Sequence, residues 1–269
     1  FSLKPSHAKM IEKANLIIWV GEDLETFLEK PLKTISKDAV NVEIMDLKGI
    51  KKLKFREKNI FEGHDDHGHG HKEHKEHGHD EHKEHGHKEK KHDDHGHEGH
   101  AHGEHDPHVW LDPMNAKIIV KEIENQLVKL DPDNASKYKA NSKKAQSELD
   151  NLTKNIKKDL KKDLRFVVFH DAYQYFENRF GIKVLGALTV NPDILPGAEQ
   201  LSEIREVIEH EKVNCLFSEP QFNPAIIKSI AKDTKIKTGV LDPLGATLDK
   251  GKGMYSNLLQ NIYASFKGC

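Results

Sequence analysis

Short apolar runs alternate with amphipathic stretches near both ends of this chain. Near its start, an apolar run at 16–20 and an alternating run at 40–44 have the length and β-branched character of strands. An amphipathic stretch at 22–29 lies between them and predicts a helix. Near its end the alternation repeats, with strands predicted at 166–170, 184–190, 215–217 and 236–241, and helices at 172–180, 196–211, 224–232 and 254–266. Strands that alternate with helices predict the α/β class with parallel sheets.

The middle of the chain predicts two long helices. Residues 114–130 carry an apolar stripe at helical spacing, whereas residues 135–164 contain no proline or glycine and few apolar side chains. A helix of about 30 residues would span about 45 Å, which is longer than a small domain. It could be a surface helix, but we expect a rigid connection, because a fresh α/β pattern begins where it ends. The length of 269 residues also suggests two domains, which we predict as an N-terminal lobe at 1–134, a linking helix at 135–164 and a C-terminal lobe at 165–269.

A histidine-rich run at 64–105 interrupts the first lobe. It has almost no apolar side chains, so we expect a disordered loop, because burial cannot offset the entropy of ordering it. Neutral imidazole is the commonest metal ligand in proteins, and a flexible array of imidazoles suits zinc, copper or nickel. The alternatives are an expression tag or a solvating loop, but the run is internal and mixed in charge. The candidate weak metal sites are His64, His67, His69, His71, His74, His77, His79, His82, His85, His87, His92, His95, His97, His100, His102 and His105.

The overall charge argues against some partners. A formal net charge of −2 gives no general attraction to nucleic acid or to an anionic membrane, and lysine alternates with acidic residues instead of forming a basic patch. No run approaches the roughly 18 apolar residues of a membrane helix. Because the chain opens at Phe1 without a methionine, we expect a mature or truncated chain that lacks its targeting segment.

The cysteines leave two alternatives open. Cys215 and Cys269 are the only two in the chain, which is too few for a zinc–thiolate site. They could form one disulfide, which would indicate an oxidising compartment, or they could be unrelated thiols.

Outside the histidine-rich run, two histidines and one carboxylate are candidate metal ligands. His170 and Asp242 follow predicted strands, and ligands of open α/β sheets collect at the carboxyl ends of strands. Together with His108, they make a plausible set of two histidines and an acid for zinc. Each histidine alone could be structural. A zinc hydrolase also fits such a set, although the chain has no HExxH helix and no GxSxG elbow.

Five motifs in order carry a resemblance to a known family. They are DPHVWLDP at 106–113, FHDAYQYF at 169–176, NPDILPGAE at 191–199, SEPQF at 218–222 and LDPLG at 241–245. Through these motifs, which are spread over nearly the whole chain, the sequence resembles the ZnuA-like zinc-binding receptors of ABC importers. The resemblance implies two α/β lobes joined by one long helix, with the metal in the cleft between them. It also implies a periplasmic, non-catalytic protein that carries Zn²⁺ to a membrane permease, and we expect a monomer.

The same resemblance implies roles for individual residues. His108 and His170 correspond to two zinc ligands, and Asp242 to a carboxylate that can face the metal. Manganese-type relatives typically carry glutamate at the His170 position, so this histidine favours zinc. We expect its other ring nitrogen to contact a carboxylate or a carbonyl, as is usual for zinc histidines. A third histidine is expected directly before the segment that begins at Phe1, and a Cys215–Cys269 disulfide is implied.

Three alternatives remain from the sequence. The chain could be a receptor for manganese or another divalent ion, a periplasmic zinc store in which the histidine-rich loop is the functional part, or a zinc hydrolase.

Deletion of the histidine-rich run distinguishes a receptor from a zinc store. A variant that lacks residues 64–105 should lose several weak zinc sites and keep one tight site, because His108 lies outside the deletion. Binding by the run itself should fade below about pH 6, since protonated imidazole cannot ligate a metal. Calorimetric zinc titration of both chains measures this, and loss of the tight site on deletion would favour a zinc store.

Overall fold

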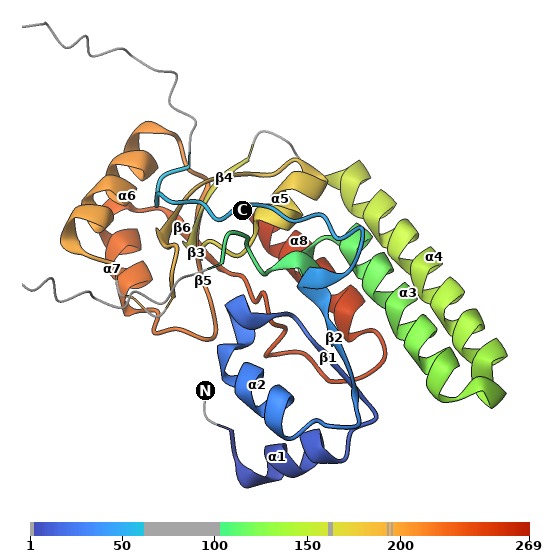
Figure 1. Cartoon of the computed structure of the whole chain (residues 1–269). Helices are drawn as coiled ribbons and strands as arrows, with labels where there is room; N and C mark the ends of the chain where they lie inside the picture. The colour runs from blue at the N-terminus through green and yellow to red at the C-terminus, as the bar shows by residue number, and fades with distance from the viewer. Residues whose placement is uncertain (1–2, 62–102, 161–163, 193, 195) are drawn as a thin grey trace, which may run out of the picture. The chain divides into compact units, whose positions relative to one another are not determined.

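The computed structural model describes residues 3–61, 103–160, 164–192, 194 and 196–269 (Figure 1). Most of the histidine-rich run, from His64 to His102, therefore lies outside the described residues. The α/β class with parallel sheets, predicted from the sequence, is confirmed.

The first sheet has two parallel strands. The strand β1 (Leu16–Trp19) pairs with β2 (Val40–Glu43), and the helix α2 (Glu22–Thr34) connects them after α1 (Pro5–Glu12). Gly21 makes the strand-to-helix turn at a φ of 151°, where an added Cβ would lie 2.7 Å from Oε1 of Glu43. A larger residue would therefore be strained at this turn. The helix α2 continues past residue 29, where its amphipathic pattern ended, and includes Pro31.

The second sheet has four parallel strands in the order β4-β3-β5-β6. Their bounds are β3 (Arg165–His170), β4 (Lys183–Thr189), β5 (Cys215–Ser218) and β6 (Lys237–Val240). Helices cover both faces of this sheet, namely α5 (Gln174–Phe180), α6 (Ala198–His210), α7 (Ala225–Thr234) and α8 (Met254–Gly268). Burial on both faces explains why β3, β4 and β5 are largely continuous apolar runs, whereas β6 is an edge strand whose residues are exposed or half-buried.

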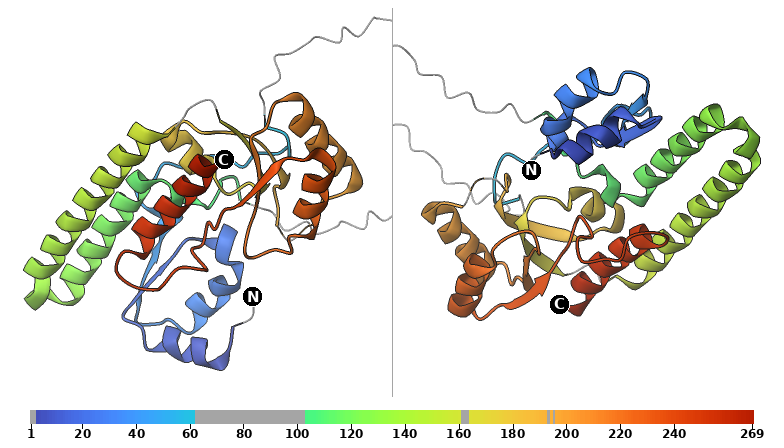
Figure 2. Two further views of the ribbon diagram at one scale, coloured as in Figure 1. Left: turned by 180° about the vertical axis from the view of Figure 1, so that it is seen from behind. Right: turned by 90° about the horizontal axis from the view of Figure 1, so that it is seen from below.

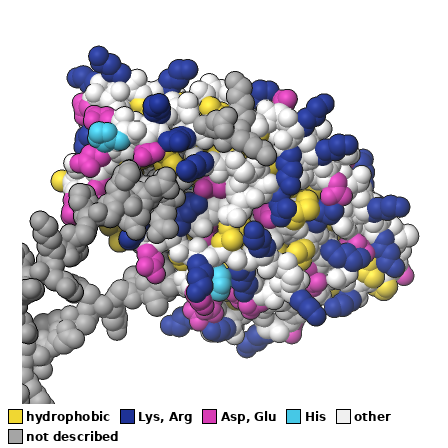
Figure 3. All heavy atoms as spheres, turned by 90° about the horizontal axis from the view of Figure 1, so that it is seen from above, with side chains coloured by type: hydrophobic (Ala, Val, Ile, Leu, Met, Phe, Trp, Pro, Cys, Tyr) yellow, Lys and Arg dark blue, Asp and Glu magenta, His cyan; other side chains and the backbone are white. Residues whose placement is uncertain are grey.

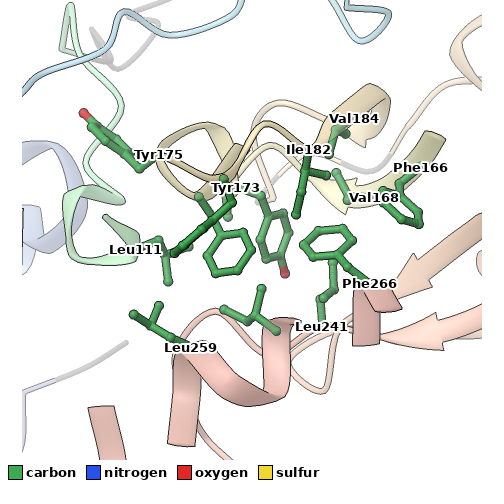
Figure 4. Packing of buried hydrophobic residues seen from close by; sticks show 14 of the residues in the cluster. Leu111, Phe166, Val168, Tyr173, Tyr175, Ile182, Val184, Leu241, Leu259 and Phe266 are labelled. Atoms are coloured by element: carbon green, nitrogen blue, oxygen red, sulfur yellow. The ribbon is translucent and has the colours of Figure 1, made fainter. Parts of the chain in front are cut away.

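The alternation of side chains along β3 divides the core. Val167 and Phe169 belong to one cluster with residues of α6 and α7. Phe166 and Val168 point the other way and pack with α5 and α8, where Phe266 lies between strand and helix (Figure 4). This second cluster also contains Val109 and Leu111, so the segment that follows the histidine-rich run packs on the same sheet.

Two long helices form an antiparallel pair (Figure 2). They are α3 (Pro113–Leu130) and α4 (Ala135–Asp159), joined through a short 3₁₀ turn at Pro132–Asn134. Asp112 caps α3 by accepting from the backbone of Met114, and Arg179 holds the same carboxylate through two contacts of 2.6 Å. The helix α4 ends earlier than the predicted residue 164. Among the described residues, no helix is both long and apolar enough to cross a membrane.

The segments on either side of the histidine-rich run are paired with the folded chain. Lys54 and His105 form an antiparallel bridge, and Asp106 N donates to Leu53 O at 2.9 Å. On the other side, Ile60 forms an antiparallel bridge with Gly186 of β4. An added Cβ at Gly186 would come 2.8 Å from the backbone oxygen of Asn59, so this close approach requires glycine.

A disulfide joins Cys215 of β5 to Cys269 at the end of α8, with a Cα–Cα distance of 5.9 Å. Of the two alternatives that the cysteine count allowed, the structure shows the disulfide, as the family resemblance implied. It fixes the last helix to the central part of the four-stranded sheet.

Removal of this disulfide should lower the free energy of unfolding by about 2–5 kcal/mol, because the bond restricts the unfolded chain. Urea unfolding of the oxidised protein, with and without a reductant, measures the change. The Cys269→Ser variant is the control. Its urea midpoint should match that of the reduced protein and should not change when reductant is added. Equal midpoints for the oxidised and reduced protein would show that the bond adds no stability.

Candidate metal centre

Two histidines that are far apart in the sequence face each other at the carboxyl edge of the four-stranded sheet. His108 lies just before the 3₁₀ turn Val109–Leu111, and His170 is the last residue of β3. Both side chains are buried, and their Nε2 atoms are 3.4 Å apart. The structure therefore brings together the two histidines that the sequence singled out.

A buried carboxylate orients each imidazole. Nδ1 of His108 lies 2.6 Å from Oδ1 of Asp106, and Nδ1 of His170 lies 2.7 Å from Oε1 of Glu219. An ionised carboxylate only accepts hydrogen bonds, so each Nδ1 carries the proton and donates it. When both rings are neutral, the two Nε2 lone pairs are directed at the same small space and cannot hydrogen-bond to each other. The expectation that His170 contacts a carboxylate or carbonyl is confirmed by Glu219.

The distance between the two Nε2 atoms suits a zinc ion. Tetrahedral zinc binds nitrogen at about 2.0–2.1 Å, which places two nitrogen ligands about 3.4 Å apart. The observed separation is 3.4 Å. An ion held by both Nε2 atoms would also remove the repulsion between their lone pairs.

The backbone and neighbouring tyrosines hold the two carboxylates in place. Asp106 accepts from the backbone N of His108 at 2.9 Å, and its carbonyl accepts from the hydroxyl of Tyr175 at 2.7 Å. Glu219 directly follows β5 and accepts from the hydroxyl of Tyr173 at 3.1 Å. Carboxyl ends of neighbouring parallel strands meet at one edge, which explains why Glu219 reaches His170.

The surroundings carry an excess of buried negative charge. Asp106, Asp171, Glu177 and Glu219 are all buried, and the guanidinium of Arg56 bonds to two of them, Asp171 and Glu177. Burial raises the pKa of Asp171 to about 7 although Arg56 opposes the shift. Oδ2 of Asp106 is buried and has no hydrogen-bond partner among the described residues. A bound cation would reduce this charge imbalance.

The same charges act on His108. Burial disfavours its protonated form, but the attraction and hydrogen bond of Asp106, with smaller effects of Asp171 and Glu219, outweigh burial and raise the pKa of His108 above 6.5. Protons therefore compete for this imidazole at a higher pH than for an isolated histidine.

Asp242 lies in the loop after β6, at the same edge of the sheet. Its Oδ1 accepts from Gln221 at 2.8 Å, and its Oδ2 accepts from the backbone and hydroxyl of Thr247 at 3.0 Å. Burial acts to raise the pKa of Asp242, but these hydrogen bonds lower it overall. The next residue, Pro243, accepts from the indole of Trp110, whose ring centroid is 5.2 Å from that of His108. A direct bond from Asp242 to a metal stays a prediction.

The remaining predicted ligands are not part of this pair. The histidines from His64 to His102 lie outside the described residues, and His105 forms the bridge with Lys54. Within the part of the chain that the structure describes, no three His, Cys, Asp or Glu side chains form a group that could hold a metal ion. His108 and His170 therefore supply two donors of a set that needs others.

Asp106, Glu219 and Arg56 also contribute to the site, although the sequence pattern alone predicts no role for them. The two carboxylates stand in quoted motifs, each directly before a proline, and the general rule that metal-binding histidines donate to carboxylates could have indicated them. Arg56 stands in a polar segment without periodicity, so nothing in the sequence marked it.

A parallel α/β fold with two facing imidazoles, each oriented by a buried carboxylate, defines a class of proteins suited to bind a divalent metal. Residues 1–269 match the family described as "Zinc-uptake complex component A periplasmic", and the chain belongs to this family.

Individual relatives agree with this assignment. The chain is 48% identical over 271 residues to the high-affinity zinc uptake system protein ZnuA of Brucella abortus, covering 100% of the chain and 80% of that protein. It resembles a crystal structure of ZnuA with a TM-score of 0.70 at 20% identity, covering 99% of this chain and 85% of that one. A Mn-bound periplasmic metal-binding protein from Candidatus Liberibacter asiaticus has a TM-score of 0.69 at 20% identity, covering 100% of this chain and 86% of that one. At these identities the solved structures show the fold alone.

Replacement of His170 by alanine should weaken the tight zinc site by orders of magnitude, because one of the two Nε2 donors is lost. Glu219→Gln should weaken the site by about 10–100-fold, since a neutral amide replaces the carboxylate that accepts from Nδ1 of His170. Calorimetric zinc titration measures both effects, and urea unfolding checks that the fold survives.

His210→Ala is the matched control, since His210 is exposed near the end of α6 and should leave the tight site unchanged. If His170→Ala binds zinc as tightly as the unmodified chain, His170 is not a ligand.

Proposed function

We propose that this chain is a high-affinity zinc-binding receptor, the solute-binding protein of an ABC-type zinc uptake system. It binds Zn²⁺ in the periplasm and delivers the ion to a membrane permease. The observation that carries this proposal is the pair of Nε2 atoms of His108 and His170, 3.4 Å apart and each backed by a carboxylate. The name of the family and the names of its relatives support the same function.

The donor chemistry supports zinc over manganese. Imidazole suits zinc, whereas manganese prefers sites rich in carboxylate and other oxygen donors. The carboxylates of Asp106 and Glu219 bond to the histidines and so act as orienting groups for imidazole donors. Asp242, at the same edge of the sheet, would supply a further donor to the ion.

No bond is made or broken in the proposed cycle, so the protein is a carrier and has no catalytic residue. Capture is favoured by the oriented lone pairs and by the buried negative charge. Release requires that the two histidines separate, and they belong to different segments. His108 follows Asp106 in a segment that Trp110 links to Pro243, whereas His170 is part of the central sheet. Docking on the permease would have to move the segment of His108 against the packing of Val109 and Leu111 on the sheet.

The histidine-rich run would act as a capture array for zinc. Its last residues, Glu104 and His105, pair with 54–55 and directly precede Asp106, which holds His108. Many weak sites on one tether raise the local concentration of zinc without any need for a fixed structure. The two lobes at 1–134 and 165–269 with the linking helix between them would supply the movement.

Competition titration tests the proposed function. The chain without residues 64–102 should show one tight zinc site, which manganese displaces weakly. This deletion retains 103–105, because Glu104 and His105 pair with the segment at 54–55. The affinity should fall as the pH decreases through the raised pKa of His108, since zinc needs the neutral imidazole.

Three results would contradict the proposal. Preferential binding of manganese would indicate a receptor for another divalent ion. Weak sites alone, all lost on deletion of 64–102, would indicate a zinc store. Hydrolysis of a substrate that depends on His170 would indicate an enzyme.

A further inference from the structure

One side of the helix α4 carries a row of lysines. Lys139, Lys143, Lys154, Lys157 and Lys158 are all exposed, and we call these five residues the α4 lysine face. Lys143 and Lys154 differ by eleven positions, which is about three helical turns, and the others lie three or four positions from a neighbour in the row. They therefore share one side of the helix, over a length of about 29 Å at the standard rise per residue.

The acidic residues of α4 do not neutralise this row. Glu148 lies near Lys144 on another side of the helix, and Asp159 accepts from Lys267 of α8. Asp150 lies next to the row, but its carboxylate bonds to Lys117 of α3 at 2.6 Å. None of the five lysines forms an ion pair with another described residue. The expectation that lysine forms no basic patch is therefore wrong for this helix, because the helical turn separates charges that alternate in the sequence.

The row ends in a hollow with further positive charge. A depression of about 490 Å³ is lined by Lys154, Lys157, Lys158 and Arg179, together with Met114, Asp150 and Thr153. Arg179 holds Asp112 and Lys117 holds Asp150, so neither acid pairs with the three lysines, although Lys158 also acts on the carboxylate of Asp159. In the view from above, Lys and Arg side chains are spread over the visible face, and Asp and Glu side chains lie among them (Figure 3).

We propose that the α4 lysine face is a docking surface for the phosphate headgroups of an anionic phospholipid membrane. Protein interfaces are enriched in aromatic residues and arginine and depleted in lysine. This face has lysines separated by small or polar residues, such as Ala140, Ser147 and Asn151, and no aromatic residue to anchor a protein partner. Flexible ammonium groups suit mobile headgroups, which do not present one fixed geometry.

The expected strength follows from the number of lysines. Each lysine close to an anionic membrane surface strengthens the attachment about fivefold. Five lysines on one side give a reversible attachment that depends on salt, since exposed charges are screened. The proposal does not depend on zinc binding, because the face and the histidine pair share no residue.

Vesicle co-sedimentation at about pH 7.5, in the presence of a chelator that removes bound metal, tests the proposal. The chain should sediment with vesicles that contain phosphatidylglycerol and not with phosphatidylcholine vesicles. Neutralisation of three lysines, as Lys154→Gln, Lys157→Gln and Lys158→Gln together, should lower the partition coefficient about a hundredfold. The matched control neutralises the exposed Lys228, Lys232 and Lys237, which lie on α7 and β6, and should bind almost as the unmodified chain does.

Equal losses in the two triple variants would overturn the proposal, because the attachment would then follow net charge alone. Absence of binding to phosphatidylglycerol vesicles, or binding only to vesicles that contain the permease, would also overturn it. Inorganic phosphate at constant ionic strength should not compete, and strong competition would indicate a site for free phosphate. Zinc titration and urea unfolding should be unchanged in both variants, which shows that each one folds.

Discussion

The hydrogen bonds that two buried carboxylates accept from two imidazoles determine the chemistry of this protein. Because Asp106 and Glu219 each accept a hydrogen bond from Nδ1–H, the tautomer of each neutral imidazole is fixed. The Nε2 atoms of both rings then face the same point. Among the described residues around this point, buried acidic side chains outnumber basic ones. The fold serves this arrangement. The parallel sheet brings His170 and Glu219 to one edge, and the core residues Val109 and Leu111 fix the segment that carries His108.

This arrangement carries a cost in stability that a bound ion would offset. Four buried carboxylates near one guanidinium are unfavourable, and burial, with smaller effects of Glu177 and Asp106, raises the pKa of Asp171. Arg56 reduces the cost by bonding to Asp171 and Glu177, and its guanidinium also lies over the ring of Phe61 at 3.9 Å. The charged groups around the histidine pair thus include one from the segment that leads into the histidine-rich run.

The sequence predicted most of the secondary structure because the strands of a covered parallel sheet are continuous apolar runs. It predicted the end of α2 too early, because Pro31 and weak periodicity hid the last turns, and it extended α4 too far, because residues 160–164 contain no helix breaker. His108 and His170 could be identified by residue type and motif. A carboxylate partner for each histidine could be expected in general, but which acids fill that place, and that Arg56 bonds to Asp171 and Glu177, depends on which segments meet in space. The α4 lysine face was missed for a related reason, because a linear sequence mixes charges that a helix separates.

The bridges of Lys54 with His105 and of Ile60 with Gly186 make the length and composition of the histidine-rich run independent of the rest of the fold. Backbone contacts with the folded chain hold the residues that flank the run on both sides. The distance between these flanking residues therefore does not depend on the run itself. The entropy of closing such a loop changes by only about 0.6 kcal/mol for each doubling of its length. Insertions, deletions and repeats within the run can therefore accumulate over evolution at little expense to the rest of the protein. The number of histidines could then follow the metal supply of each habitat, while the geometry at His108 stays the same.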